Sequence, residues 1–218
     1  MSRSGRPKVH THLSRESIAR AGLEIVDRRG LDALSLRAVA EALGVGTMTL
    51  YAHTPDRETL ERDIVGLLLD EVDVHEISGE VWDDSVRRVA WSLREMTLRH
   101  PRAFALVADA PVFESPVLEY AARIRALHAR EKIGQERFVS MWSVCDAFLT
   151  GFMVMLAQAA VHAGEAADPS HAAAASGTSS DRELAAALAD VLSEEAFARD
   201  LEVVLAGLRA SGIAGDAV

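Results

Sequence analysis

The chain has a single cysteine, Cys145, so it cannot form an internal disulfide and suits a reducing compartment. Aromatic residues make up only 5% of its 218 residues, while alanine and leucine abound, and this balance favours helix over sheet. No uninterrupted apolar run reaches 18 residues, and the N-terminus is basic and polar. We therefore expect an all-α cytoplasmic protein with neither a membrane span nor a secretory signal.

Motifs that carry catalysis or hold cofactors are also missing. The sequence has no glycine-rich phosphate loop, paired-cysteine zinc site, H-E-x-x-H or nucleophile elbow. Only Cys145, Asp146 and His128 could form a nucleophile set, and Cys145 falls in an apolar helical stripe, where a free cysteine behaves as a small hydrophobe. His10 and His12 have a spacing that can bind metal, but no further ligand is near. We expect no enzyme, no cofactor and no metal site.

Charge is unevenly spread along the chain, whose net charge is −10. Residues 1–62 hold 10 Lys+Arg and 8 Asp+Glu, whereas the remainder holds 13 Lys+Arg and 25 Asp+Glu. Residues 1–12 contain Arg3, Arg6 and Lys8 and no acid, and we expect them to form a disordered basic arm. The distribution favours a nucleic-acid surface in the N-terminal part of the chain and an acidic remainder that phosphate repels.

The stretch from Ser35 to Leu60 reads as two short helices joined by a tight turn. Ser35 can cap the first helix, and Gly44 is placed to end it in the left-handed conformation. A second helix starts near Thr47, with Leu50 facing inward. This pattern is typical of a helix-turn-helix, whose second helix enters the DNA major groove, although an ordinary helical hairpin shares the spacing.

The side chains around Leu50 favour DNA binding, because they are small or hydrogen-bonding and none is acidic. Residues 13 to 62 resemble the N-terminal domain of the tetracycline-repressor (TetR) family. The matching residues are Gly30, Gly44, Val45, Thr49, Leu50, Tyr51, His53 and Arg57. Thr54 and Pro55 depart from that pattern, since an apolar and a basic residue are usual there.

The resemblance implies a three-helix helix-turn-helix domain over 13–60 and a C-terminal helical ligand-binding and dimerisation domain over 61–218. It implies a ligand-responsive transcriptional regulator, a repressor that binds a palindromic operator as a homodimer and is released by a small apolar effector. A regulator or architectural protein without an effector remains the alternative. The expected DNA contacts are Ser35, Arg37, Thr47, Met48, Thr49, Tyr51, Ala52, His53 and Arg57. Arg37 can contact either a base edge or a phosphate.

Helical periodicity covers most of the chain. The expected helices span 15–29, the two of the motif, 56–75, 80–99, 102–109, 116–131, 135–162, 181–192 and 194–210, with a mobile loop at about 164–180. Methionine and aromatic side chains adapt to apolar ligands, although plain core packing accounts for each of them equally well. The candidate effector-pocket residues are Met96, Phe104, Phe113, Met141, Trp142, Phe148 and Met153.

Helices 135–162 and 194–210 each have two apolar faces, and both faces cannot be buried within one small domain. One face of each helix is therefore expected to meet a second copy of the chain. The pairing resembles the TetR family's dimer interface, a four-helix bundle. The candidate interface residues are Leu149, Leu156, Phe197, Leu201, Val204 and Leu208.

Overall fold

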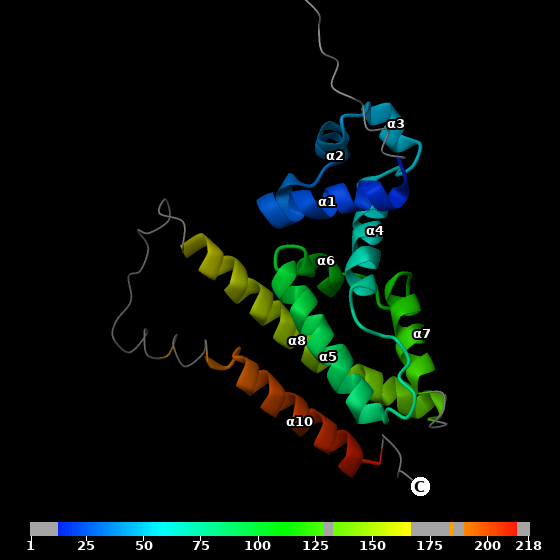
Figure 1. The fold of residues 1–218 in the computed structure, drawn as a ribbon, viewed down its shortest axis with the longest axis vertical. Coiled ribbons are helices and arrows are strands. Elements are labelled where there is room, and N and C mark those ends of the chain that lie inside the picture. The colour runs from blue at the N-terminus through cyan, green and yellow to red at the C-terminus, as the bar shows by residue number, and fades with distance from the viewer. Residues whose placement is uncertain (1–12, 129–132, 167–183, 185–189, 213–218) are drawn as a thin grey trace, which may run out of the picture.

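The computed structural model describes residues 13–128, 133–166, 184 and 190–212 (Figure 1). Within these ranges the regular elements are all helical and no strand is present, which confirms the all-α prediction. The helices are α1 (Arg15–Arg29), η1 (Leu31–Ala33, a 3-10 turn), α2 (Leu36–Leu43), α3 (Thr47–Tyr51), α4 (Arg57–Asp70), α5 (Trp82–Arg99), α6 (Phe104–Ala108), α7 (Val117–Leu127), α8 (Gln135–Ala166) and α10 (Glu194–Ala210). The predicted basic arm, most of the predicted loop and most of the predicted helix 181–192 lie outside the described residues.

Most helix bounds fall close to the prediction, but the helix predicted over 56–75 ends five residues early, at Asp70. The backbone after it is extended, and the Asp73 and His75 carbonyls both accept hydrogen bonds from the Arg88 guanidinium. In a continuing helix these two carbonyls would accept hydrogen bonds from backbone amides further along the helix. Here they accept hydrogen bonds from the Arg88 side chain instead. Periodicity predicted the apolar spacing of this segment correctly and its conformation wrongly.

The N-terminal domain is formed by α1, α2, α3 and the first half of α4 (Figure 1). The helices α1 and α4 cross closely at Gly22, where an added Cβ would lie only 2.9 Å from Ile64 Cδ1. Leu60 and Ile64 are fully buried against α1. The predicted domain boundary at residue 60 therefore falls inside one continuous helix, and α4 joins the N-terminal domain rigidly to the rest of the chain.

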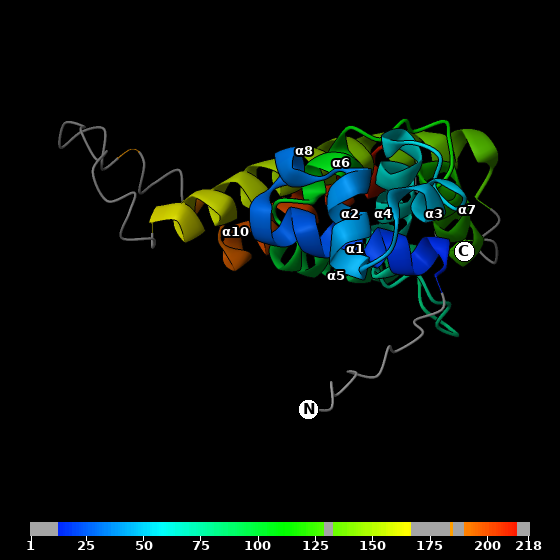
Figure 2. The ribbon, with the colours of Figure 1, turned by 90° about the horizontal axis from the view of Figure 1, so that it is seen from above.

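The C-terminal part is a layered arrangement in which α5 packs on the long α8, and α10 runs alongside α8 (Figures 1 and 2). Trp91 of α5 meets Phe197 of α10 edge-on, with 4.9 Å between ring centroids, and Phe152 of α8 lies 4.9 Å from the same ring. The guanidinium of Arg87 on α5 pairs with Glu202 on α10. The three helices thus share one core, with Phe197 at its centre.

The helix α8 is long and apolar enough to cross a membrane by length and composition, with a mean hydropathy of 1.7 over the tested part of Gln135–Gly164. Core helices of folded proteins pass the same test, although only 28% of this window is buried within the described chain. Here α8 packs against α5, α6 and α10, and it carries the half-buried carboxyl of Asp146 midway along its length. We therefore assign α8 to the folded C-terminal part.

Candidate DNA-reading helix and ligand cavity

The turn between α2 and α3 is set by its caps. Ser35 Oγ accepts a hydrogen bond from the Ala38 amide at 3.1 Å and so starts α2. Gly44 ends the helix in the left-handed conformation, with φ 66° and ψ 29°, which a residue without Cβ adopts at little cost. The Val45 amide then donates to the Ala40 carbonyl at 3.0 Å, so the orientation of α3 relative to α2 is well determined.

The outer face of α3 is available for contact with another molecule. Leu50 is fully buried and anchors the helix, while Met48 is 81% exposed and Thr49 and Tyr51 are also exposed. All nine predicted DNA contacts lie on α2, on α3, at the cap and turn beside them or on the first residue of α4. Eight are exposed and Thr47 is half-buried, so the structure brings the predicted set together at one end of the molecule.

Two residues beside α3 differ in their surroundings. Arg57 is exposed, and its Nε donates to Glu61 Oε1 at 2.7 Å, so its guanidinium is already paired on the surface. Thr54 is fully buried, and its hydroxyl has no hydrogen-bond partner within the described residues. The departure of Thr54 from the family pattern therefore concerns the core of the N-terminal domain and not its outer surface.

Polar contacts join the N-terminal domain to α5 near the end of that helix. His100 Nδ1 lies 2.8 Å from Asp27 Oδ2 of α1, and His100 Nε2 lies 3.3 Å from Glu71 Oε1 just after α4. Arg99 pairs with Glu71 at 3.0 Å. Burial raises the pKa of Asp27, while its hydrogen bond to His100 acts in the opposite direction. These contacts fix α1 and the end of α4 against α5.

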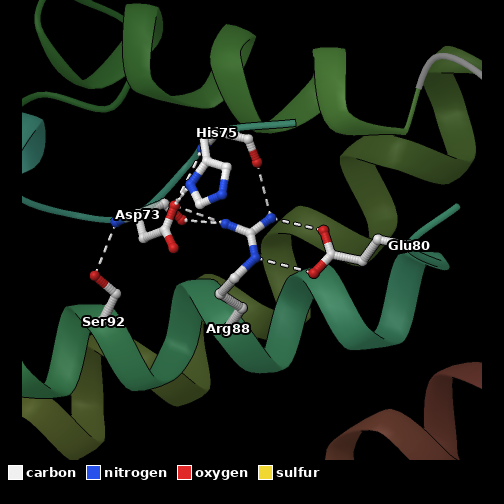
Figure 3. Close-up of polar contacts among 5 residues, drawn as sticks. All are labelled: Asp73, His75, Glu80, Arg88 and Ser92. Carbon is white, nitrogen blue, oxygen red and sulfur yellow. Dashed lines mark hydrogen bonds and ion pairs between the residues drawn. The ribbon is translucent and has the colours of Figure 1, made fainter. Parts of the chain in front are cut away.

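A second junction is the Arg88 cluster, formed by Arg88 of α5 with Asp73, His75 and Glu80 (Figure 3). Arg88 donates to both Glu80 oxygens, at 2.9 Å and 2.6 Å, and to Asp73 Oδ1 at 2.8 Å. Its remaining donors reach the Asp73 and His75 carbonyls at 3.0 Å and 2.9 Å. Ser92 accepts a hydrogen bond from the Asp73 amide at 2.8 Å. The chain that leaves α4 is therefore tied to one side of α5.

The neighbouring face of α5 lines a cavity of about 70 Å³ between α5, α7 and α8. Its wall is mainly apolar and aromatic. The apolar lining residues are Val86, Val89, Leu93, Ile124, Phe138, Met141, Trp142 and Leu149. The polar lining residues are Ser85, Tyr120, His128, Cys145, Asp146 and Thr150. A largely apolar cavity with a few converging polar groups is typical of a small-molecule site.

Burial shifts the titration of the polar wall. It lowers the pKa of His128, although the charge of Glu80 opposes this, so the imidazole is neutral at pH 7. Burial raises the pKa of Asp146, and raises that of Cys145 to about 11, so the thiol stays protonated. The three residues that sequence analysis weighed as a nucleophile set do meet at this cavity, but the thiol is not activated.

Two family models match the chain. Residues 18–62 match the model described as bacterial regulatory proteins, tetR family, and residues 78–211 match the tetracyclin repressor-like C-terminal domain. The chain belongs to the TetR family. It is therefore an all-helical, DNA-binding transcription regulator with a helix-turn-helix, as its sequence predicted. Proteins of this family are generally transcription factors and not enzymes.

Individual relatives agree with this assignment. The chain is 27% identical over 143 residues to an HTH-type transcriptional regulator of Saccharopolyspora erythraea, covering 64% of this chain and 59% of the relative. It is 26% identical over 144 residues to the HTH-type transcriptional repressor DrrR1 of Streptomyces coeruleorubidus, covering 64% of this chain and 52% of DrrR1. The chain thus matches little more than half the length of these two curated relatives. The solved structure of the Streptomyces coelicolor TetR family protein ActR with actinorhodin superposes with a TM-score of 0.69 and 28% identity, covering 95% of this chain and 100% of ActR.

The cavity of this TetR-family chain includes only two of the seven predicted pocket residues, Met141 and Trp142. Met96, Phe104 and Met153 are buried in the core, Phe148 is half-buried beside Phe197, and Phe113 is 89% exposed on the surface. The prediction selected residue types that suit ligands, but periodicity does not tell which buried face borders a void. Tyr120 and the α5 residues of the wall were missed, whereas His128 was noticed only as a possible nucleophile.

The predicted dimer residues also lie elsewhere than expected. Leu149, Leu156, Phe197, Leu201 and Leu208 are buried within the single chain, and Val204 is half-buried. Their stripes are the inner faces of α8 and α10, because Phe197 and Leu201 belong to the shared core. The exposed apolar or small residues on the opposite faces include Val144, Ala147, Gly151 and Met155 on α8 and Val203, Ala206 and Gly207 on α10.

Proposed function

We propose that this TetR-family regulator is a repressor that binds a palindromic operator as a homodimer and leaves it when a small effector enters the cavity between α5, α7 and α8. The observation that carries the proposal is the continuous connection from α3 to that cavity. The helix α4 extends from the N-terminal domain, and the chain after it is bound to Arg88 of α5. Val86 and Val89, which line the cavity, flank Arg88 in the same helix.

A ligand that displaces α5 would therefore also displace Arg88 and the end of α4. Both helices of a helix-turn-helix dimer dock only if their half-sites lie about one DNA turn, roughly 34–36 Å, apart. An effector that favours a different separation of the two N-terminal domains would lower DNA affinity by its preference for that state. The relatives support this direction, since one is named a transcriptional repressor and ActR is solved with a small molecule.

The side chains at the start of α3 are proposed to read bases. Thr47 and Met48 begin the helix, and Met48 is 81% exposed. Selection of duplexes from a randomised pool by the purified protein should return a two-fold symmetric site. Replacing Met48 with Ala should change the preference at one or two positions of each half-site by about 1–3 kcal/mol. A site without two-fold symmetry, or an unchanged preference profile, would contradict the proposal.

The alternative without an effector makes a different prediction for the same operator. In that case no small molecule that binds the cavity changes the affinity for DNA. Titrating a cavity ligand into the protein–operator complex, with fluorescence anisotropy of labelled DNA as the readout, separates the two. Release that saturates with ligand supports the repressor proposal, and constant anisotropy at saturating ligand supports the alternative.

A further inference from the structure

One polar group of the cavity wall is buried without a partner in the described chain. His128 is only 3% exposed, and its Nδ1 has no hydrogen-bond partner among the described residues. Tyr120 and the half-buried Asp146 line the same cavity, where a bound molecule could reach them. Buried polar groups are paired in most proteins, by protein, water or ligand. The unpaired imidazole therefore points to a bound molecule that carries polar atoms.

The charge of the wall is of one sign. Asp146 is the one charged side chain among the described lining residues, and the imidazole of His128 is neutral at pH 7. No lysine or arginine lines the cavity among the described residues, and two arginines of α5 and α7 are paired elsewhere, since Arg123 pairs with Asp70 at 2.7 Å and Arg88 is bound within its own cluster. A ligand with a negative group would therefore meet Asp146 without a cation from the described wall to offset the repulsion.

The aromatic part of the wall adjoins this carboxyl. The Trp142 ring lies 6.0 Å from Tyr120 and 6.2 Å from Phe138 between centroids, and Trp142 and Asp146 are one turn apart on α8. Aromatic faces attract cations and pack against other rings. A carboxylate next to aromatic faces is complementary to a ligand whose aromatic ring carries an ammonium group on a short alkyl chain.

We infer that the cavity takes a small arylalkylamine in its ammonium form, with its ring against Trp142 and its nitrogen at the Asp146 carboxylate, and that it rejects aromatic carboxylates. The inference rests on the proposed function, because it concerns the effector of the same regulator. Tyr120 and His128 would accept hydrogen bonds from the remaining N–H groups of the ammonium. The cavity of about 70 Å³ is smaller than a typical ligand pocket, so even a single ring requires the surrounding helices to move apart, and a large fused system is disfavoured further.

Three probes of nearly equal size test the inference on the full-length protein at pH 7: benzylamine, benzyl alcohol and benzoate. Ligand-observed NMR titration should give benzylamine a dissociation constant at least ten-fold lower than that of benzoate, with the alcohol between them. Asp146→Asn should remove most of the difference between benzylamine and benzoate. Glu136→Gln, an exposed α8 carboxylate that does not line the cavity, is the matched control and should leave the order unchanged.

The outcomes separate this inference from the function on which it rests. Benzoate binding as tightly as benzylamine, or an unchanged preference in Asp146→Asn with the wild-type melting temperature retained, would overturn the amine assignment alone. Absence of binding by all three probes at concentrations on the order of 10 mM would overturn both the amine assignment and the effector role of the cavity. Benzylamine binding that leaves operator affinity unchanged would overturn the effector role alone. Preferential benzylamine binding that also weakens operator binding supports both.

Discussion

Thr54 shows how a single atom can limit the stability of the N-terminal domain. It occupies a position where the TetR pattern usually has an apolar side chain, and it is fully buried. Its backbone amide donates to the Leu50 carbonyl at 3.0 Å, but its hydroxyl is unpaired within the described chain. A buried hydroxyl without a partner costs roughly 1–3 kcal/mol relative to one that is hydrogen-bonded or exposed.

Replacing Thr54 with Val should therefore stabilise the protein, because Val has nearly the same shape and no polar atom. We expect the free energy of unfolding to rise by about 1 kcal/mol, which corresponds to about 2–4 °C in melting temperature for a chain of this size. Thr49→Val is the control, since Thr49 is exposed and its hydroxyl is free to meet water. Urea titration would contradict the argument if the two variants changed stability equally.

Arg57 is the residue for which a phosphate contact can be separated from base reading. Its guanidinium pairs with Glu61 in the free protein, so contact with DNA would require exchange of a carboxylate for a phosphate. Arg57→Ala should weaken binding to all sequences alike and reduce the slope of log K against log salt by about 1. Arg62→Ala removes a comparable pair with Glu58, one turn further along α4, and should change this slope little. Loss of affinity at only one operator base would instead assign Arg57 to base reading.

Among the elements, α4 and the chain that follows it connect the two parts of the protein. The Arg88 cluster holds this segment with five hydrogen bonds, and the Arg88 and Glu80 side chains are only 17% and 12% exposed. Removing one partner of a largely buried pair leaves the other charge without compensation. The cluster should therefore affect stability more than the surface pairs of this chain do.

Arg88→Met keeps much of the apolar stem and removes the donors. We expect a loss of about 2–4 kcal/mol in the free energy of unfolding. If the cluster transmits ligand binding, operator release by a cavity ligand should also become weaker. Arg123→Met removes the more exposed pair with Asp70 and should cost less than about 1 kcal/mol. Equal destabilisation by the two variants in chemical denaturation would show that the Arg88 cluster contributes no more to stability than a surface ion pair does.

The same cluster gives a pH dependence with a definite sign. Hydrogen bonds from Arg88 lower the pKa of Glu80. A carboxyl whose pKa is lower in the folded state adds stability above its unfolded pKa, about 4.3 for Glu, and loses that contribution as pH falls through the folded value. The stability difference between wild type and Arg88→Met should be constant from pH 6 to 8 and should shrink below about pH 4. A difference that grows on acidification would contradict the assignment.

These elements also show which features the sequence could predict. Caps and left-handed glycines act locally, so Ser35 and Gly44 located the two ends of α2 correctly. The end of α4 depends on Arg88, which lies 15 residues beyond Asp73, and local periodicity contains no information about that contact. The nine predicted DNA-contact residues lie together in space because a short motif keeps them together in sequence. The cavity wall combines three helices, so no spacing rule could identify it.

At the scale of the whole molecule, the question is which surface a second subunit covers. The sequence showed that α8 and α10 each have two apolar faces, but it could not tell the inner face from the outer one. The described chain buries Leu201 to 2% exposure within its own core, while Val203 on the other side of α10 is 68% exposed. On α8, Val144, Ala147, Gly151 and Met155 form an exposed stripe at one-turn spacing. A homodimer would cover these outer faces, whose small residues allow helices to approach closely.

Val203→Arg should therefore give a folded monomer of 23.5 kDa, because the substitution places charge in the proposed interface and leaves the core untouched. Obligate interfaces bury on the order of 2,000 Å² or more, and an unpaired arginine at the centre of one prevents its closure. Operator affinity should fall with dimerisation, since both half-sites must be bound together.

Leu201→Arg should instead unfold the chain, because Leu201 packs beside Phe197. Leu98→Arg, at an exposed position on α5, is the control that should remain dimeric. Light scattering and circular dichroism distinguish these results, and a Val203→Arg dimer that binds the operator normally would show that the subunits meet elsewhere.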